Sequence, residues 1–310
     1  YLTVLKSDGV IVPIDKELTA KEIINVVKRS ESEVLFYAEK YEQYIEEFKK
    51  ELPNVKYFIG FSREKDEDNV LSYDSFKDSG KEKYEAGDKT YTSIEHNDTN
   101  KLKMLVFTSG TTGNPKGVML THKNLMADVM SSEFSFPVTA YQRALSFLPA
   151  CHAYERVFQY VYMYKGLSIY FATSIETIGV DIKEVKPHIF SAVPRVLEKI
   201  YEKIMSVANE LTGVKKTLFF WAINVGEKYT IENRSMFYNL KLGIARKLIF
   251  SKWKEALGGD ILGIASGSAA LQERLITLYL AAGIPIYEGY GLTEAGPCLS
   301  VNCFKRGMKI

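Results

Sequence analysis

The chain reads, across residues 107–117, Phe107-Thr108-Ser109-Gly110-Thr111-Thr112-Gly113-Asn114-Pro115-Lys116-Gly117. Residues 104–107 are apolar and predict a buried strand, and residues 121–131 predict a helix. Glycines in such a loop free backbone N–H groups that converge on an anion, while hydroxyls add donors and the lysine adds positive charge. The stretch therefore predicts a phosphate-binding loop between a strand and a helix, in preference to a plain surface turn.

The spacing of the lysine separates this loop from the Walker loop of conventional nucleoside triphosphatases. A Walker loop needs a second glycine after four spacers, followed by lysine and then serine or threonine. Counting from Gly110, Pro115 stands in the place of that second glycine, and Gly117 follows Lys116 in place of a hydroxyl residue. We therefore expect phosphate to be held by a different geometry.

The composition is that of an ordinary globular protein. Its 310 residues suffice for two domains or a single large one. Hydrophobic residues make up 46% and charged residues 25%, and the net charge of +2 gives no electrostatic reason to expect nucleic acid as a partner.

No run of the sequence approaches the ~20 apolar residues of a membrane span. Cys151, Cys298 and Cys303 have no zinc-like spacing and cannot all pair, so we expect a reduced, cytoplasmic setting, with peripheral membrane attachment left open.

Apolar runs and amphipathic stretches alternate along most of the chain. Thr19, with Glu22 three residues later, predicts a capped helix start. Pro194 predicts the first turn of another helix, and residues 214–257 are predicted to be mainly helical. Strands are predicted at residues 10–14, 34–37, 55–59, 144–148, 167–171, 188–193, 261–265 and 285–290, with a helix at 41–52. This alternation predicts an α/β fold with mainly parallel sheets flanked by helices.

Residues 62–100 interrupt the alternation, because lysine, glutamate, aspartate, serine and glycine dominate there and apolar residues are few. We interpret this stretch as an exposed connection between subdomains. The sequence accordingly predicts one α/β subdomain at residues 1–100 and a second at residues 101–310.

Two later stretches carry residue types suited to a nucleotide. Residues 265–270, Ala-Ser-Gly-Ser-Ala-Ala, follow a predicted strand, and their small side chains would let a flat ring lie against the backbone. Within residues 287–294, Tyr290 can stack on a base, Thr293 can donate to phosphate, and Glu294 offers hard oxygen ligands for Mg²⁺. The alternatives are a plain strand-to-helix turn at 265–270, core packing of Tyr290 and a solvated carboxylate at Glu294.

Two further residues could meet an anion. His152 follows a predicted strand and starts a predicted helix, so its ring could lie beside a carboxylate substrate or simply cap the helix. Arg195, directly after Pro194, could neutralise an anion, although we favour a structural pair with a nearby acid.

These three loops, in this order, resemble those of the adenylate-forming superfamily, which includes acyl-CoA synthetases, firefly-luciferase-like enzymes and peptide-synthetase adenylation domains. Residues 108–117 resemble the phosphate loop of the superfamily, and Tyr290-Gly291-Leu292-Thr293-Glu294 resembles its Tyr-Gly-x-Thr-Glu motif. Residues 148–156 and 192–199 are most similar to the long-chain fatty acid CoA ligase branch. The resemblance extends along the whole chain.

The resemblance implies the large N-terminal domain of the adenylate-forming fold, truncated at both ends. The ribose-binding Thr-Gly-Asp motif and the C-terminal lid domain with the family's catalytic lysine are not found after Glu294, and the family's first stretch is not found before Tyr1. We therefore expect both subdomains to be incomplete, with the lid domain absent, and this chain alone to be inactive or nearly so.

The resemblance also implies an activity. In this family an ATP-dependent ligase joins a carboxylate to AMP with release of pyrophosphate, and then passes the acyl group to the thiol of coenzyme A. The full-length protein is thus expected to be an acid–thiol ligase that uses a long-chain fatty acid, ATP and coenzyme A, with Mg²⁺. An adenylating ligase for an aryl or amino acid and a non-catalytic nucleotide-binding protein stay as alternatives, and a homodimer is left open.

The roles of individual residues are implied by the same resemblance. Thr108 and Glu294 would hold Mg²⁺, and the loop through Lys116 would surround the departing pyrophosphate. Thr293 would contact the α-phosphate, and His152 would lie near the acyl carboxylate. The implied catalytic residues are Thr108, Lys116, His152, Thr293 and Glu294. The implied ATP-binding residues are Thr108, Ser109, Gly110, Thr111, Thr112, Gly113, Lys116, Gly267, Ser268, Ala269, Glu288, Gly289, Tyr290, Gly291 and Thr293.

Overall fold

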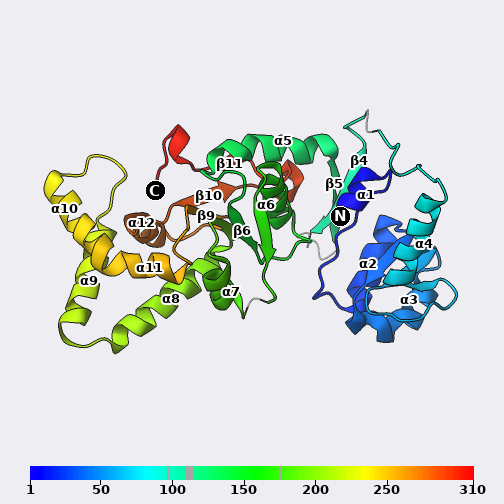
Figure 1. Cartoon of the computed structure of the whole chain (residues 1–310), viewed down its shortest axis with the longest axis horizontal. Helices are drawn as coiled ribbons and strands as arrows, with labels where there is room; N and C mark the ends of the chain where they lie inside the picture. Colours follow the sequence, from blue (N-terminus) through cyan, green and yellow to red (C-terminus); the bar gives the residue numbers. More distant parts are fainter. Residues whose placement is uncertain (96–97, 109–114, 175) are drawn as a thin grey trace. The chain divides into compact units, whose positions relative to one another are not determined.

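The computed structural model describes residues 1–95, 98–108, 115–174 and 176–310. The chain divides into two compact units, Tyr1–Lys123 and Asn124–Ile310 (Figure 1). Each unit has its own sheet and its own hydrophobic core, so the two are described separately below.

The first unit is built on a small parallel sheet. Its strands, in spatial order, are β1 (Val34–Tyr37), β2 (Tyr57–Gly60) and β3 (Val70–Ser72). Its helices are α1 (Leu2–Lys6), α2 (Ala20–Ser30), the 3₁₀ helix η1 (Glu39–Tyr44), α3 (Ile45–Glu51) and α4 (Tyr73–Glu85). The predicted capping box is confirmed, because the Thr19 hydroxyl accepts from the Glu22 N–H and the Glu22 carboxylate accepts from the Thr19 N–H.

One prediction for this unit is wrong. Residues 10–14 form no strand, and only Ile11 makes a bridge, to Met104. Pro13 lacks the N–H that would continue the ladder, which fits the short pairing. Residues 62–100, predicted as an exposed connection or a junction between subdomains, are exposed over most of their described length. They also contain β3 and α4, two elements that the sequence does not predict, and α4 buries none of its residues.

A two-stranded antiparallel hairpin completes the first unit. It pairs β4 (Leu102–Thr108) with β5 (Lys116–Thr121), and its register places Thr108 opposite Lys116. The sequence predicts β4 and the helix α5 (His122–Ser132) that follows, but not β5. The candidate phosphate loop therefore connects the two strands of a hairpin and does not lead directly from a strand into a helix.

The second unit is built on a six-stranded sheet with the order β11-β10-β9-β8-β6-β7. The strands are β6 (Arg143–Ser146), β7 (Ser168–Phe171), β8 (Ile189–Ala192), β9 (Gly263–Ser266), β10 (Ile286–Tyr290) and β11 (Ser300–Val301). All neighbours are parallel except β10 and β11. The predicted α/β fold with mainly parallel sheets is confirmed, and every residue of β8 and β9 is buried, as expected for strands covered on both faces.

Helices surround this sheet (Figure 1). After α5 come α6 (Ala153–Tyr164), α7 (Ile178–Val185), α8 (Pro194–Glu210), α9 (Gly213–Glu227), α10 (Met236–Ala245), the π-helical turn η3 (Arg246–Phe250), α11 (Ser251–Ala256) and α12 (Glu273–Ala281). Short 3₁₀ turns are η2 (Glu133–Ser135), η4 (Thr293–Ala295) and η5 (Phe304–Arg306). Within the described part of the chain, no helix combines the length and the apolar character needed to cross a bilayer.

Candidate functional site

The carboxyl ends of the parallel strands bring the second and third predicted loops together. In the sheet register, Ser266 at the end of β9 pairs with Glu288 of β10 on one side and with Ala192 of β8 on the other. The loops that follow β9 and β10 therefore leave the same edge of the sheet from adjacent strands. This places residues 267–269 beside residues 289–294, as the sequence predicts for a nucleotide site.

The loop after β9 needs small residues for a physical reason. A Cβ at Gly267 would lie 2.6 Å from Cε2 of the Tyr154 ring, too close for any side chain. The Tyr154 ring belongs to α6, and its hydroxyl donates to the Ala192 carbonyl at 3.3 Å. Ser268 has φ of +69°, a left-handed conformation that is uncommon for serine, and both Ser268 and Ala269 are exposed. The backbone of this loop is thus held open to solvent against an aromatic ring.

Glu288 links this loop to β10. Its carboxylate accepts a hydrogen bond of 2.9 Å from the N–H of Leu271, just ahead of α12. At least one oxygen of this predicted ATP-binding residue is therefore used to fix the backbone between β9 and α12.

The segment after β10 presents its functional side chains outward. Tyr290 is 70% exposed, so the alternative of core packing is wrong for this ring. Thr293 and Glu294 lie in the 3₁₀ turn η4, and Glu294 is exposed. Two backbone hydrogen bonds close the hairpin with β11, from the Leu299 N–H to the Tyr290 carbonyl and from the Asn302 N–H to the Glu288 carbonyl. The exposed aromatic ring and carboxylate therefore stand on a well-anchored loop.

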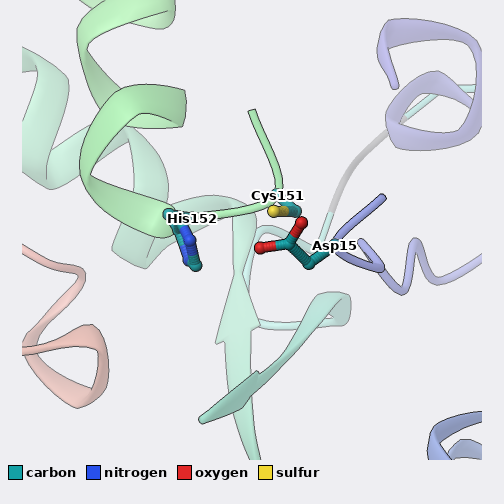
Figure 2. Close-up of side chains that lie close together, drawn as sticks. All are labelled: Asp15, Cys151 and His152. Carbon is teal, nitrogen blue, oxygen red and sulfur yellow. The ribbon is translucent and has the colours of Figure 1, made fainter. Parts of the chain in front are cut away.

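His152 lies at the end of the loop after β6, where it is the N-cap residue of α6. Its side chain makes no capping hydrogen bond to the helix, which argues against the capping alternative. Figure 2 shows the exposed His152 ring standing out from the first turn of α6, beside Cys151 of the preceding loop. Its predicted place near an acyl carboxylate stays a prediction.

The structural pairing favoured for Arg195 is confirmed, because its guanidinium lies 3.3 Å from Glu198 and 3.2 Å from Glu202.

The remaining predicted residues belong to the first unit or lie outside the described residues. Thr108 and Lys116 face each other across the β4–β5 hairpin. Ser109, Gly110, Thr111, Thr112 and Gly113 fall in the stretch 109–114, which the structure does not describe. The convergence of this hairpin with Thr293 and Glu294 on one ligand stays a prediction.

Two buried acids were given no role by the sequence reasoning. The first, Glu155 of α6, accepts from the Ser146 hydroxyl at 2.5 Å and from the Ser191 hydroxyl, while the Gln159 amide donates to Ser146 at 2.9 Å. Ser146 ends β6 and Ser191 lies in β8, so one carboxyl group connects α6 to two neighbouring strands. Burial raises the pKa of Glu155 to about 7, against the lowering effect of these hydrogen bonds.

The second, Asp128 of α5, accepts a hydrogen bond of 2.8 Å from the N–H of Cys298, in the loop between η4 and β11. Burial raises the pKa of Asp128 to about 6, and the hydrogen bond from Cys298 only partly opposes this. An acid on the same helix face as the buried Leu125 and Val129 was the available signal for both the burial and the raised pKa.

We expect Asp128→Asn to change how stability depends on pH. The unfolded carboxyl loses its proton near pH 4, whereas the folded one keeps it to about pH 6. The contribution of Asp128 is therefore complete below pH 4 and is lost as pH rises through 6, by on the order of 3 kcal/mol at most. Asparagine keeps an acceptor for the Cys298 N–H and does not titrate. The free energy of unfolding of the variant should therefore rise relative to that of the wild type between pH 4 and 6.

Urea unfolding at a series of pH values measures the effect. Asp78→Asn, at an exposed position of α4, serves as the matched control and should follow the wild type. Parallel curves for the wild type and Asp128→Asn between pH 4 and 7 would contradict the prediction.

Comparison with known proteins shows which family this chain belongs to. The family model described as AMP-binding enzyme matches residues 1–309. The chain belongs to the AMP-binding enzyme family. Residues 108–117 and 290–294, which the sequence predicts as phosphate and nucleotide contacts, both lie within the matched range.

Curated relatives of this AMP-binding enzyme carry ligase names. Long-chain-fatty-acid–CoA ligase 1 of Cavia porcellus is 38% identical over 214 residues, which cover 64% of this chain and 29% of the relative. Long-chain-fatty-acid–CoA ligase ACSBG2 of Homo sapiens is 34% identical over 243 residues, which cover 75% of this chain and 36% of the relative. The chain thus spans about a third of the length of these relatives.

Solved structures share the fold at low sequence identity. A long-chain-fatty-acid-CoA ligase from Archaeoglobus fulgidus aligns with a TM-score of 0.67 at 17% identity, covering 97% of this chain and 51% of that one. The adenylation domain of a carboxylate reductase from Mycobacterium chelonae aligns with a TM-score of 0.68 at 19% identity, covering 96% and 45%. The predicted adenylate-forming fold is therefore confirmed, while the fold alone does not select the acid that is activated.

Proposed function

We propose that the full-length protein activates a long-chain fatty acid with ATP and transfers the acyl group to coenzyme A. The observation that carries the proposal is the placement of residues 267–269 beside residues 289–294 at adjacent strand ends, in a chain whose curated relatives are named long-chain-fatty-acid–CoA ligases. A cytoplasmic location, with attachment to a membrane surface, and a homodimer belong to the same proposal.

The proposed reaction has two steps. A carboxylate oxygen of the fatty acid attacks the α-phosphorus of ATP, the bond from this phosphorus to the pyrophosphate oxygen breaks, and an acyl-adenylate forms. The sulfur of the coenzyme A thiolate then attacks the acyl carbon, and AMP leaves. In the first step the protein has to align the carboxylate with the phosphorus and neutralise the charge on the departing pyrophosphate.

Each of the predicted site residues suits one of these tasks. The exposed Tyr290 ring would stack on adenine, against the backbone that follows Gly267. The Thr293 hydroxyl would donate to the α-phosphate, and the Lys116 ammonium would pair with the pyrophosphate. His152 would lie beside the acyl carboxylate.

The residues present also fit a magnesium ion. Glu294 is exposed and makes no ion pair with any described residue, so its oxygens are available to a ligand. Thr108 of the first unit would add a hydroxyl oxygen, and oxygen atoms are the ligands that Mg²⁺ prefers. When bound, the ion would neutralise phosphate charge.

Steady-state release of pyrophosphate by the full-length protein tests the proposed substrate. We expect turnover with fatty acids, rising with chain length, and subsequent formation of acyl-CoA when coenzyme A is added. Pyrophosphate release that depends on an amino acid or an aryl acid, without a response to fatty acids, would support the alternative ligase.

We expect Lys116→Ala in the full-length protein to lower kcat/KM for adenylate formation by about tenfold or more, because a charge opposite the pyrophosphate is lost. Lys21→Ala, at an exposed position of α2, is the matched control and should leave the rate unchanged. Unchanged turnover of Lys116→Ala would favour a protein that binds nucleotide without this chemistry.

A further inference from the structure

An apolar stripe covers the exposed side of α10 and η3. It consists of the adjacent Met236 and Phe237, followed on the same helical run at steps of three or four residues by Leu240, Ile244 and Leu248. Met236 is 89% exposed, Phe237 66% and Leu240 63%. Large apolar side chains that are exposed together on one helix indicate a surface that binds a protein or a membrane.

The core fixes the orientation of this helix. Leu242 and Ala245 on its other side are buried, and Phe250 of η3 is completely buried. The Tyr238 hydroxyl donates to the Val225 carbonyl of α9 at 2.8 Å. The apolar stripe therefore cannot turn inward without removing these buried residues from the core. Figure 1 shows α9 and α10 at the periphery of the second unit, beyond α11 and α12.

The charged residues of the segment that carries the stripe are all basic. No acidic residue occurs from residue 233 to residue 254, whereas Arg234, Lys241, Arg246, Lys247, Lys252 and Lys254 lie in that range. Some of these cations have partners: Arg246 donates to the Ala281 carbonyl, and Lys252 pairs with Glu255. Lys241 and Lys247 are exposed on the same helical run as the stripe, and the Lys241 ammonium lies 4.4 Å from the centre of the Phe237 ring.

We propose that the apolar stripe, with Lys241 and Lys247, docks on the surface of an anionic phospholipid bilayer. The apolar side chains enter the boundary between headgroups and acyl chains, and the lysines extend to the phosphate and carboxylate groups. The attraction of the lysines to the anionic surface strengthens binding, and salt screens this attraction. A second copy of this chain fits less well, because a two-fold interface through the stripe would bring like charges of both copies together.

The inference deepens the proposed function, because a fatty acid with a long chain partitions into bilayers and a docked enzyme would take it from there. The binding itself needs no substrate. A failure of docking is therefore measured separately from a failure of the ligase activity.

Co-sedimentation of the full-length protein with vesicles tests the proposal. One set of vesicles is phosphatidylcholine alone, and the other is phosphatidylcholine mixed with phosphatidylserine. We expect binding to the mixed vesicles that weakens as salt is raised, and little binding to the neutral ones. The double variant Phe237→Ser/Leu240→Ser and the double variant Lys241→Glu/Lys247→Glu should each bind the mixed vesicles at least tenfold more weakly.

Matched controls change similar residues elsewhere. Val180→Ser alters an apolar residue of α7 that is 66% exposed, and Lys203→Glu reverses an exposed charge on α8. Both should bind the mixed vesicles like the wild type, and all variants should unfold at the wild-type temperature. Undiminished vesicle binding by the stripe variants, or no binding by the wild type, would overturn the proposal. So would self-association of the wild type that the Phe237→Ser/Leu240→Ser variant abolishes in the absence of vesicles, because it assigns the stripe to a second copy.

Discussion

Replacing Gly291 with alanine is expected to destabilise the protein by about 3 kcal/mol or more, and to weaken nucleotide binding with it. A Cβ at this position would lie 1.8 Å from the carbonyl oxygen of Pro297 and 2.9 Å from its carbonyl carbon. Both atoms belong to the backbone, so no side-chain rotation removes the clash. The loop has to open instead, and Tyr290 and Thr293 move with it.

The loop has little freedom to open, because it is held on both sides of the close approach. The Tyr290 carbonyl accepts from the Leu299 N–H, and the Cys298 N–H donates to the buried Asp128. A displacement of Pro297 therefore strains or breaks the hydrogen bonds that Cys298 and Leu299 donate. Gly291 must lack a side chain because the backbone at Gly291 passes very close to the backbone at Pro297. This close approach lies next to the predicted adenine and phosphate contacts.

Urea unfolding and calorimetric titration with ATP, both on the full-length protein, measure the two effects of Gly291→Ala. Gly179→Ala in α7 is the control, because a Cβ there would meet nothing within 4 Å. Alanine at that helical position should leave stability unchanged or raise it by up to about 1 kcal/mol. A Gly291→Ala protein with the wild-type unfolding midpoint and ATP affinity would show that the two segments can separate freely.

Secondary structure was predictable where short apolar runs are buried on both faces. The predicted range 188–193 contains β8, and the predicted range 261–265 overlaps β9. Every residue of both strands is buried, so the sequence pattern and the environment agree. The strand β5 was missed because it begins with Lys116 and Gly117 and leaves Met119 exposed. Its stability comes from pairing with β4, a contact that no pattern within residues 116–121 specifies.

The candidate site was predictable to the extent that its chemistry lies in contiguous residues. Residues 265–270 and 287–294 carry small, aromatic and acidic side chains in a fixed order, and the parallel pairing of β9 with β10 brings them together. The partners of Asp128 and Glu155 could not be predicted in this way. Asp128 and Cys298 are 170 residues apart, and Glu155 and Ser191 are 36 apart. Such pairs are set by the tertiary fold, and only the unusual position of an acid among apolar residues indicates them beforehand.

Removal of the Glu155 side chain is expected to have the other large effect, a loss of about 3–5 kcal/mol for Glu155→Ala. The carboxyl group is completely buried and accepts from both Ser146 and Ser191. Alanine leaves these two hydroxyls without their acceptor and creates a cavity between α6 and the ends of β6 and β8. The change is measured by urea unfolding, with Glu198→Ala in α8 as a control for loss of a partly exposed carboxyl.

Glu155→Gln separates the charge of this group from its hydrogen bonds. The unfolded carboxyl loses its proton near pH 4.5, whereas the folded one keeps it to about pH 7. The stability that protonated Glu155 provides is thus complete below pH 4.5 and is lost as pH rises through 7, by on the order of 3 kcal/mol. Glutamine fills the same space, offers an oxygen to one serine and does not titrate.

The two variants should therefore diverge with pH. Glu155→Gln is expected to match the wild type near pH 4.5 and to exceed it in stability at pH 8, while Glu155→Ala stays below the wild type throughout. The pH ranges over which Glu155 and Asp128 lose their stabilising effect overlap only in part. A loss of stability between pH 6 and 8 is therefore assigned to Glu155 if it persists in Asp128→Asn and disappears in Glu155→Gln. The prediction is contradicted if the stability of Glu155→Gln follows that of the wild type from pH 4.5 to 8. In that case ionising the buried carboxyl group would cost no free energy of folding, because the hydrogen bonds of the serines and Gln159 would fully replace its hydration.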